Sequence, residues 1–221
     1  MGGVLELERF DRDNRISITV IRRLPKYYRY LEDLMNKGIN RISSQELSKL
    51  TGFTASQIRQ DLNNFGGFGQ QGYGYNVEEL HNELGKILGL TTVYKAVIAG
   101  AGNLGQAIAN YKGFEDAGFK VVSLFDKNPK LIGLKIRDIE IRDVDIMEQF
   151  IKENGIDIGI ITAPKESAQE IANTFVRAGV KGIWNFAPID LVVPESVVVE
   201  NVRLNESLFI LSYFLREKFG K

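Results

Sequence analysis

Apolar positions in the first third of the chain recur at helical spacing in three short stretches, near residues 25–37, 43–50 and 54–65. Pro25 suits the first turn of the first stretch, and Gly38 suits the position just after its end. The pattern therefore predicts three helices in this part of the chain.

The second and third stretches carry clear start signals. Ser43 followed three residues later by Glu46 is a capping-box pattern, and Thr54 or Ser56 can cap the third helix. The expected buried faces comprise Leu47, Leu50, Ile58 and Leu62. Because only the tight turn Thr51-Gly52 separates them, the two helices are predicted to form a helix-turn-helix.

The ten residues from Gly66 to Tyr75 contain five glycines, with aromatic side chains between them. This composition excludes a helix and predicts a turn or hairpin. After a helix-turn-helix, such a hairpin resembles the wing of a winged-helix domain, and we place the end of the first domain at residue 76.

From residue 77 onward, helical stretches alternate with short apolar runs. A helix from Val77 to Leu88, capped by Asn76, is expected to link two domains over residues 77–92. Apolar runs at 94–99, 120–125, 158–161 and 182–185 predict buried strands, and helical stretches lie at 106–111, 144–154 and 167–178. The alternation predicts an α/β domain with a doubly wound parallel sheet over residues 93–202.

The last segment, residues 203–221, is predicted to hold a helix from Leu204 to Phe219 that is apolar nearly all round. A helix with so little polar surface must be buried on several sides. It either packs across a subunit interface, which we favour, or covers one edge of its own sheet.

The formal net charge of the 221-residue chain is zero, but the charges are unevenly placed. Between Asn14 and Asn76 there are nine basic and four acidic residues, a net of +5, whereas the residues from Val77 to the end carry −3. The basic excess on the predicted helix-turn-helix is compatible with phosphate contacts, and equally with a solvated basic surface.

The first predicted strand of the second domain runs directly into a G-x-G-x-x-G sequence that opens a helix. In the Rossmann fold the first glycine permits a tight turn, the second lets the backbone approach a pyrophosphate, and the third allows close helix–strand packing. We assign the whole loop to cofactor contact: Gly100, Ala101, Gly102, Asn103, Leu104 and Gly105.

The second strand ends in Asp126, which lies 21 residues after Gly105 and is placed to accept hydrogen bonds from a ribose diol. A carboxylate there also repels a ribose phosphate, which favours NAD(H) over the phosphorylated dinucleotide, and Lys127 slightly weakens that preference. A CoA-binding or nucleotide-sugar domain of the same topology is the alternative.

Two further loops follow predicted strand ends, where ligands of parallel sheets bind. They either line the nicotinamide half of the site or are ordinary proline-bearing loops. The residues assigned to the cofactor here are Thr162, Ala163 and Pro164 in one loop and Asn185 and Phe186 in the other.

In a helix-turn-helix the second helix enters the major groove, with its N-terminal residues facing base edges. Arg59 can pair with a guanine edge, and a glutamine can pair with an adenine edge. The alternative is the exposed polar face of a small helical bundle. The residues assigned to DNA contact are Ser44, Thr54, Ser56, Gln57, Arg59 and Gln60, with Arg22, Lys26, Gln71 and Tyr73 around them.

The chain has no cysteine and one histidine, His81, on the predicted linking helix. A disulfide framework, a thiolate nucleophile and a Cys/His zinc site are therefore excluded. A small NAD-dependent dehydrogenase remains the rival to a binding protein, but no general acid or base is evident near the glycine loop. No apolar run approaches the roughly 18 residues of a membrane-spanning helix and no signal peptide opens the chain, so we expect a cytoplasmic protein.

Four segments together resemble the Rex family of bacterial redox-sensing transcriptional repressors. They are Leu24 to Leu31 (LPKYYRYL), Ser56 to Leu62 (SQIRQDL), Phe65 to Gly69 (FGGFG) and Asn185 to Pro188 (NFAP). The resemblance implies a homodimer that binds a palindromic operator in double-stranded DNA, NAD(H) in Rossmann domains, and C-terminal helices exchanged between subunits. It further implies repression that is relieved as NADH rises, and a cofactor role for Tyr111.

The chain departs from the family pattern in two places. Gln70 and Gln71 stand where the family's wing usually carries basic residues. Arg203 occupies the place of an aspartate that in some members reaches the partner's site together with the tyrosine and an N-terminal arginine, here Arg22 or Arg23. We therefore expect weaker minor-groove attraction and an altered interdomain switch, with Glu206 as a substitute for the aspartate.

Overall fold

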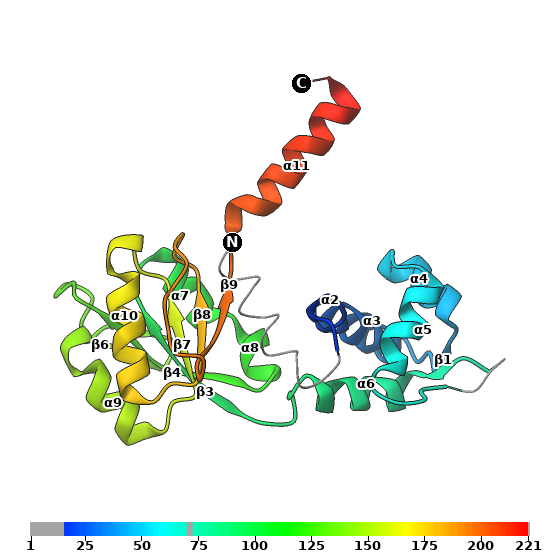
Figure 1. Ribbon diagram of the computed structural model, residues 1–221. Helices are drawn as coiled ribbons and strands as arrows, with labels where there is room; N and C mark the ends of the chain where they lie inside the picture. The colour runs from blue at the N-terminus through cyan, green and yellow to red at the C-terminus, as the bar shows by residue number, and fades with distance from the viewer. Residues whose placement is uncertain (1–15, 70–72, 221) are drawn as a thin grey trace. The chain divides into compact units, whose positions relative to one another are not determined.

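A computed structural model describes residues 16–69 and 73–220, and divides the chain into two compact units between Thr92 and Val93 (Figure 1). The first unit contains the helices α2 (Ile18–Ile21), α3 (Leu24–Asn36), α4 (Ser44–Thr51), α5 (Ala55–Asn63) and α6 (Val77–Ile87). Strands β1 (Arg41–Ile42) and β2 (Tyr75–Asn76) pair antiparallel, with Ile42 opposite Tyr75. The predicted helix-turn-helix, α4 and α5, is present.

The capping residues in the sequence predicted the ends of these helices to within about two residues. Ser43 and Glu46 form the predicted capping box, and Thr54, rather than Ser56, caps α5 through a second capping box with Gln57. Helix α5 ends at Asn63, two residues before the predicted end. Leu50 was expected to be buried but is 40% exposed, because the buried face of α4 consists of Leu47 and Thr51.

Helix α6 was predicted to link two domains, but it packs into the core of the first unit. Val77, Leu80 and Leu84 on one face of α6 are buried with Tyr27 and Leu31 of α3. The compact unit therefore extends through Thr92 instead of ending at residue 76. The short strand β1, which the sequence pattern did not predict, holds the base of the glycine-rich segment through its pairing with β2.

The second unit is built on a seven-stranded sheet of order β5-β6-β4-β3-β7-β8-β9. All neighbouring pairs are parallel except β5–β6. The strands are β3 (Tyr94–Ala99), β4 (Phe119–Asp126), β5 (Lys135–Ile136), β6 (Ile139–Asp143), β7 (Ile158–Ile161), β8 (Gly182–Asn185) and β9 (Val198–Asn201). The helices are α7 (Asn103–Asn110), α8 (Lys112–Asp116), α9 (Met147–Asn154) and α10 (Lys165–Ala178), with a 3₁₀ turn, η1 (Val144–Ile146), before α9. The predicted doubly wound sheet is confirmed, and it contains three further strands, β5, β6 and β9, of which β5 and β9 form its edges.

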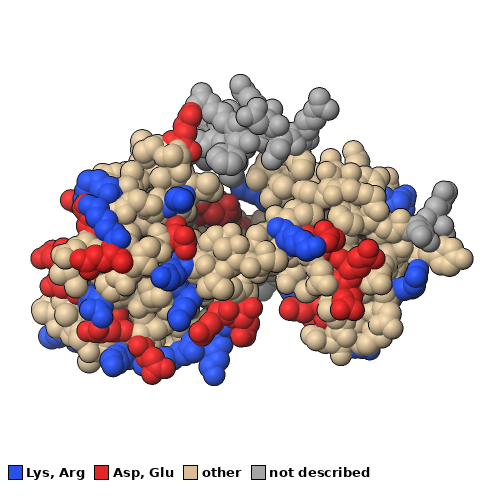
Figure 2. Space-filling view, turned by 90° about the horizontal axis from the view of Figure 1, so that it is seen from below, with Lys and Arg blue, Asp and Glu red and all other residues tan. Residues whose placement is uncertain are grey.

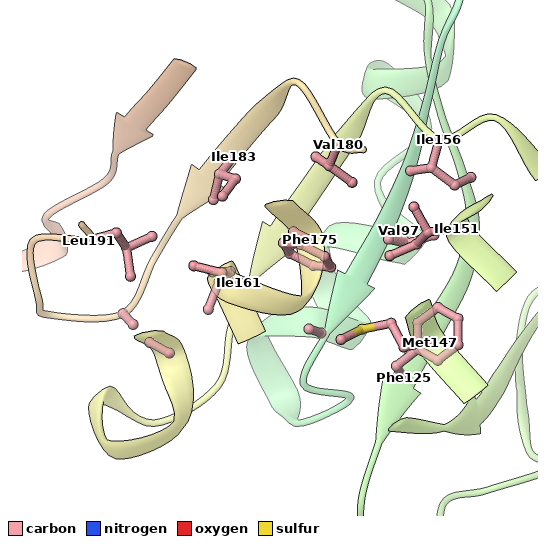
Figure 3. Close-up of a cluster of buried hydrophobic side chains, with 14 residues drawn as sticks. Val97, Phe125, Met147, Ile151, Ile156, Ile161, Phe175, Val180, Ile183 and Leu191 are labelled. Atoms are coloured by element: carbon pink, nitrogen blue, oxygen red, sulfur yellow. The ribbon is translucent and has the colours of Figure 1, made fainter. Parts of the chain in front are cut away.

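Strand β3 lies at the centre of the sheet and supplies side chains to both faces. Val97 points into a core that also contains Met147 of α9 and Phe175 of α10 (Figure 3). Ile98 points into the opposite core with Ile108 of α7. Because successive strand residues face opposite sides, the continuous apolar run of β3 reflects burial on both faces.

Helix α11 (Leu204–Phe219) has the predicted bounds, but none of its residues is buried. Eight of its large apolar side chains, including Phe209, Tyr213 and Phe214, are more than half exposed. The alternative in which this helix covers an edge of its own sheet is therefore wrong for the chain as described. None of the helices in the described residues is long and apolar enough to cross a membrane.

Candidate dinucleotide and nucleic-acid sites

The loop between β3 and α7 has two glycines that the protein's own packing requires. Gly100 has a φ of +106°, and a Cβ on it would lie 2.9 Å from the backbone nitrogen of Ala163. A Cβ on Gly105 would lie 2.0 Å from the carbonyl oxygen of Gly100. Side chains at these two positions would therefore distort the loop itself.

Gly102, in contrast, has no protein atom within 4 Å of where its Cβ would stand. It is the N-cap of α7, with no side chain bonded to the free backbone amides of the first turn. These amides and the positive end of the helix are suited to an anion. The open space at Gly102 thus fits the close approach of a dinucleotide's pyrophosphate.

Asp126 lies beside this loop, as its place at the end of β4 predicted. Its Oδ2 accepts a hydrogen bond of 2.7 Å from the backbone amide of Ala101, and its Oδ1 accepts one of 2.8 Å from the amide of Asn128. Each carboxylate oxygen has a second lone pair. The carboxylate can therefore position the loop and still accept a hydrogen bond from a ribose.

Two more side chains support the loop. The hydroxyl of Thr162 donates a hydrogen bond of 2.7 Å to the carbonyl of Gly100, and the amide of Gln106 donates one of 2.8 Å to the carbonyl of Ala101. The structure brings Thr162 to the predicted site, where its hydroxyl contacts the loop. Gln106 was not predicted from the sequence, although its position in the first turn of the helix after the glycines was a usable signal.

Asn185 ends β8 and shapes the loop that follows it. Its side chain is fully buried, where the amide donates to the carbonyl of Ile189 at 2.9 Å and to Oδ1 of Asn201 at 2.8 Å. Its own Oδ1 accepts from the amide of Ala187 at 3.0 Å. The side chain predicted to line the cofactor is therefore committed to bonds with the loop and with the end of β9.

A row of aromatic rings connects the end of α7 with this same loop. Tyr111, which is 61% exposed, packs edge-on against Phe114, and Phe114 packs against Trp184 of β8. Trp184 in turn contacts Phe186, with ring centroids 4.6 Å apart. The structure thus connects the predicted residues Tyr111 and Phe186 through two aromatic residues that were not predicted from the sequence.

The remaining residues predicted to contact the cofactor lie in the same loops and have different exposures. Asn103 and Pro164 are exposed, Leu104 and Ala163 are half-buried, and Lys127 is exposed directly after Asp126.

In the first unit, Ser56, Arg59 and Gln60 are exposed on α5, as predicted for a helix that reads DNA. The guanidinium of Arg59 donates a hydrogen bond of 2.8 Å to the hydroxyl of Ser44, at the start of α4. Gln57 is also exposed, but its Oε1 accepts the backbone amide of Thr54 at 3.1 Å. Gln57 and Thr54 therefore serve as a helix cap, so a base contact by Gln57 would have to break that bond.

An ion pair that was not predicted from the sequence anchors α5. Asp61 is 2% exposed and accepts hydrogen bonds from Arg23 Nε at 2.7 Å and Nη2 at 2.6 Å. It also accepts from the hydroxyl of the buried Tyr27 at 2.7 Å. The hydrogen bond with Asp61 raises the pKa of Arg23, whereas burial and then Asp61 raise the pKa of Tyr27.

The other predicted DNA contacts surround the helix-turn-helix. Arg22 is exposed, and the ammonium of Lys26 lies 5.0 Å from the ring centroid of Phe53. Tyr73 is 69% exposed and contacts Arg41, whose guanidinium carbon is 5.8 Å from its ring centroid. Gln70 and Gln71 lie outside the described residues.

Acidic side chains are concentrated on a different part of the first unit. Glu78, Glu79 and Glu83 of α6 line a shallow hollow with Lys86. Basic and acidic side chains are interspersed over the face of the second unit that Figure 2 shows. The acidic surface of α6 is unsuited to phosphates, which leaves the side of α5 as the candidate DNA-binding face.

Two family models match the chain in the places where the two sites lie. One is described as a putative DNA-binding protein N-terminus and matches residues 15–63, and the other is described as a CoA binding domain and matches residues 91–189. The second description corresponds to the alternative that the glycine loop left open.

Curated relatives resemble the chain over nearly its whole length. The redox-sensing transcriptional repressor Rex of Clostridioides difficile (strain 630) is 66% identical over 93% of this chain and 98% of its own. That of Clostridium tetani (strain Massachusetts / E88) is 60% identical over 94% of this chain and 99% of its own. The chain belongs to the Rex family. The resemblance inferred from four short segments is thus confirmed.

Solved structures of Rex-family proteins share the fold. The crystal structure of RSP in complex with NAD+ and operator DNA has a TM-score of 0.87 and 63% identity, covering 92% of this chain and 94% of that chain. RSP in complex with NADH has a TM-score of 0.86 and 60% identity, covering 92% of this chain and 95% of that chain. Both ligand classes predicted from this sequence are therefore present in structures of a similar Rex protein.

Proposed function

We propose that this Rex-family chain is a transcriptional repressor that binds operator DNA and releases it as the ratio of NADH to NAD+ rises. The observation that carries the proposal is the presence of two prepared sites in one chain. At the proposed DNA site, Arg59 on the exposed face of α5 is hydrogen-bonded to Ser44 of α4. At the proposed cofactor site, the glycine loop leaves open space at Gly102. Similar proteins have been solved with operator DNA and NAD+, and with NADH.

The ligand must act through a difference in affinity between two states of the protein, because a ligand that binds both equally shifts nothing. NAD+ carries a positive nicotinamide ring and NADH a neutral one, so a dry apolar pocket favours the reduced form. Phe186, Trp184 and Phe114 supply apolar surface at the edge of the sheet where this ring would bind. Moving a population from 1:99 to 99:1 requires about 5.5 kcal/mol of differential binding.

The active form is proposed to be a homodimer. A palindromic operator requires two recognition helices related by two-fold symmetry. The uncovered apolar residues of α11, among them Leu208 and Phe209, supply a surface that a second copy can bury. Exchange of α11 between subunits, as the family resemblance implies, is part of this proposal.

The residues proposed to hold the cofactor and the DNA are those predicted from the sequence. For NAD(H) they are residues 100–105, Asp126, Lys127, residues 162–164, Asn185, Phe186 and Tyr111, with Asn185 acting through the loop that it shapes. For DNA they are Arg22, Lys26, Ser44, Thr54, Ser56, Gln57, Arg59, Gln60, Gln71 and Tyr73. Because the DNA that it is proposed to bind lies inside the cell, the protein is proposed to act in the cytoplasm.

The test is operator binding at a fixed total concentration of NAD(H), with only the ratio of the two forms varied. Fluorescence anisotropy of a labelled operator fragment should fall as NADH replaces NAD+. Because the salt concentration strongly affects protein–DNA affinity, it must stay constant throughout. Binding that is independent of the ratio would contradict the proposed regulation, although DNA binding itself could still hold.

CoA is the second candidate ligand, because the family model that matches residues 91–189 is named for it. Isothermal calorimetry with NADH and with CoA separates the two. We expect NADH to bind in a saturable manner and CoA to give no comparable heat. The dehydrogenase considered from the sequence is not supported, since the close relatives are named transcriptional repressors.

A further inference from the structure

The connection between strand β9 and helix α11 is fastened to the loop that follows β8. The backbone amide of Val202 donates a hydrogen bond of 2.8 Å to the carbonyl of Asn185. The side-chain amide of Asn185 also donates a hydrogen bond of 2.8 Å to Oδ1 of Asn201, at the end of β9. Two polar links therefore already join the root of α11 to the edge of the sheet where the cofactor is proposed to bind.

Arg203, the residue directly before α11, adds a third and larger link. Its guanidinium donates to the carbonyl oxygens of Ala187 and Ile189, the latter at 2.9 Å from Nη2. The same Nη2 lies 2.7 Å from Oδ1 of Asp190. The side chain is 20% exposed, whereas that of Asp190 is 67% exposed, so the two carbonyl contacts lie on the more buried side of the guanidinium.

The planar fork of an arginine can bond several fixed acceptors at once, whereas a lysine ammonium is a point charge. Here the acceptors are backbone carbonyls two residues apart, so the guanidinium fixes the backbone of the loop itself. A contact with Asp190 alone would be an exposed ion pair of little energetic value. The hydrogen bonds from Arg203 to the loop carbonyls are therefore more important than its ion pair with Asp190.

The loop held by Arg203 carries Phe186, the last ring of the aromatic row that begins at Tyr111, the residue after α7. In a parallel sheet, ligands bind outside the carboxyl ends of the strands, and both β3 and β8 end at this edge. The half of a dinucleotide distal to the glycine loop would therefore contact the loop that Arg203 holds.

We propose that Arg203 is a positioning residue that couples the nicotinamide half of the cofactor site to the root of α11. Arg203 holds the loop after β8 against the connection to α11. The orientation of Phe186 therefore depends on the position of that connection, and the position of the connection depends on the orientation of Phe186. This inference rests on the proposed function, because it names a residue through which the bound nicotinamide would affect the dimerisation helix.

Calorimetry with two ligands tests the positioning role without DNA. ADP-ribose contains the adenosine, the diphosphate and the second ribose of NADH but lacks the nicotinamide. For Arg203→Met we expect the affinity for NADH to fall roughly tenfold, because the loop that carries Phe186 is no longer pre-organised, and that for ADP-ribose to stay within about twofold. Equal losses for both ligands, or no loss for either, would overturn the proposal.

A matched control is Arg177→Met on α10, which removes an arginine that is also paired with a carboxylate, Glu148, but lies away from the loop. It should leave both affinities unchanged. Arg203→Lys keeps the charge near Asp190 and loses the fork, so it should reproduce most of the NADH defect. Full recovery by lysine would show that only the charge matters and would contradict a role through the carbonyls.

Operator binding then tests the coupling. In the wild-type protein the ratio of operator affinities with NAD+ and NADH should be large, and in Arg203→Lys it should fall roughly tenfold, within the usual range of allosteric coupling. A wild-type ratio of one would defeat the proposed function, whereas an unchanged ratio in the variant would defeat only the role of Arg203. Thermal unfolding of each variant verifies folding, and Arg203→Lys serves for all measurements if Arg203→Met does not fold.

Discussion

The guanidinium of Arg59 on the recognition helix is bonded at 2.8 Å to the hydroxyl of Ser44 on the preceding helix. An exposed arginine otherwise loses considerable side-chain entropy when it is fixed against DNA. Because Ser44 already restrains it in this structure, part of that cost is met before binding. The two residues therefore act as one unit on the proposed DNA-binding face.

We expect Arg59→Ala to weaken operator binding by about 1–3 kcal/mol and to relax specificity at one base pair, as for a bidentate guanine contact. Ser44→Ala should have a smaller effect, because it removes only the restraint. Competition assays with operator variants and random DNA measure both quantities. Equal loss on operator and random DNA would show that Arg59 contacts phosphate alone.

Removal of the buried anchor of the recognition helix should affect folding of the first unit. Asp61→Ala leaves the guanidinium of Arg23, which is 17% exposed, without its carboxylate, and breaking a buried pair typically costs ~3–5 kcal/mol. Urea unfolding followed by circular dichroism measures this loss in the free energy of unfolding. Glu83→Ala, which removes an exposed partner of Lys86, is the control and should cost less than about 1 kcal/mol.

The two kinds of glycine in the cofactor loop should respond differently to alanine. Gly105→Ala places a methyl group 2.0 Å from the carbonyl oxygen of Gly100, so we expect a lower melting temperature as well as lost NADH binding. Gly102→Ala meets no protein atom and should keep the melting temperature while NADH affinity falls. Unchanged NADH affinity in a folded Gly102→Ala protein would contradict a pyrophosphate at this position.

Asp126 should determine the preference between phosphorylated and unphosphorylated dinucleotides. Asp126→Asn retains an oxygen acceptor for the amide of Ala101 but removes the negative charge that repels a ribose phosphate. We expect the ratio of NADH to NADPH affinity to fall roughly tenfold, which corresponds to about 1.4 kcal/mol. Titration of both dinucleotides by intrinsic fluorescence gives the ratio, and Asp143→Asn, an acid at the end of the neighbouring strand, is a suitable comparison.

The capping box of α4 should make one contribution to stability dependent on pH. The hydroxyl and then the backbone amide of Ser43 donate to Glu46 and lower the pKa of its carboxyl in the folded state. A lowered pKa in the folded state stabilises the protein above the ordinary glutamate range, and this contribution is lost as the pH falls through the lowered pKa. The difference in urea midpoint between wild type and Glu46→Gln should therefore shrink on acidification from pH 6 to about pH 3.

Signals that are local in sequence predicted most of the fold. Capping residues such as Ser43, the glycines after β3, and the bounds of α11 all depend on the conformation of a few adjacent residues. Strands β1 and β9 were missed because they are short and are defined by pairing with β2 and β8, which are distant in sequence. The amphipathic pattern of α6 predicted a helix but did not reveal which core its apolar face would join.

In the candidate sites, too, features that depend on local sequence were predicted, whereas contacts between residues distant in sequence were not. The motif predicted that Asp126 would lie beside the glycine loop, because strand order places both at one edge of the sheet. Neither the bond from Arg203 to the carbonyl of Ile189 nor that from Arg23 to Asp61 could be predicted. These pairs are 14 and 38 residues apart, and only the folded backbone brings their atoms together.

The exposed apolar surface of α11 links folding to the amount of protein present. If a second copy covers this surface, as proposed, the folded state is stabilised by mass action, so the melting temperature of this chain should rise with protein concentration. Newly made subunits at low abundance would expose α11 and be more open to proteolysis than assembled ones. The cellular level of the repressor would then depend on its own assembly as well as on its synthesis.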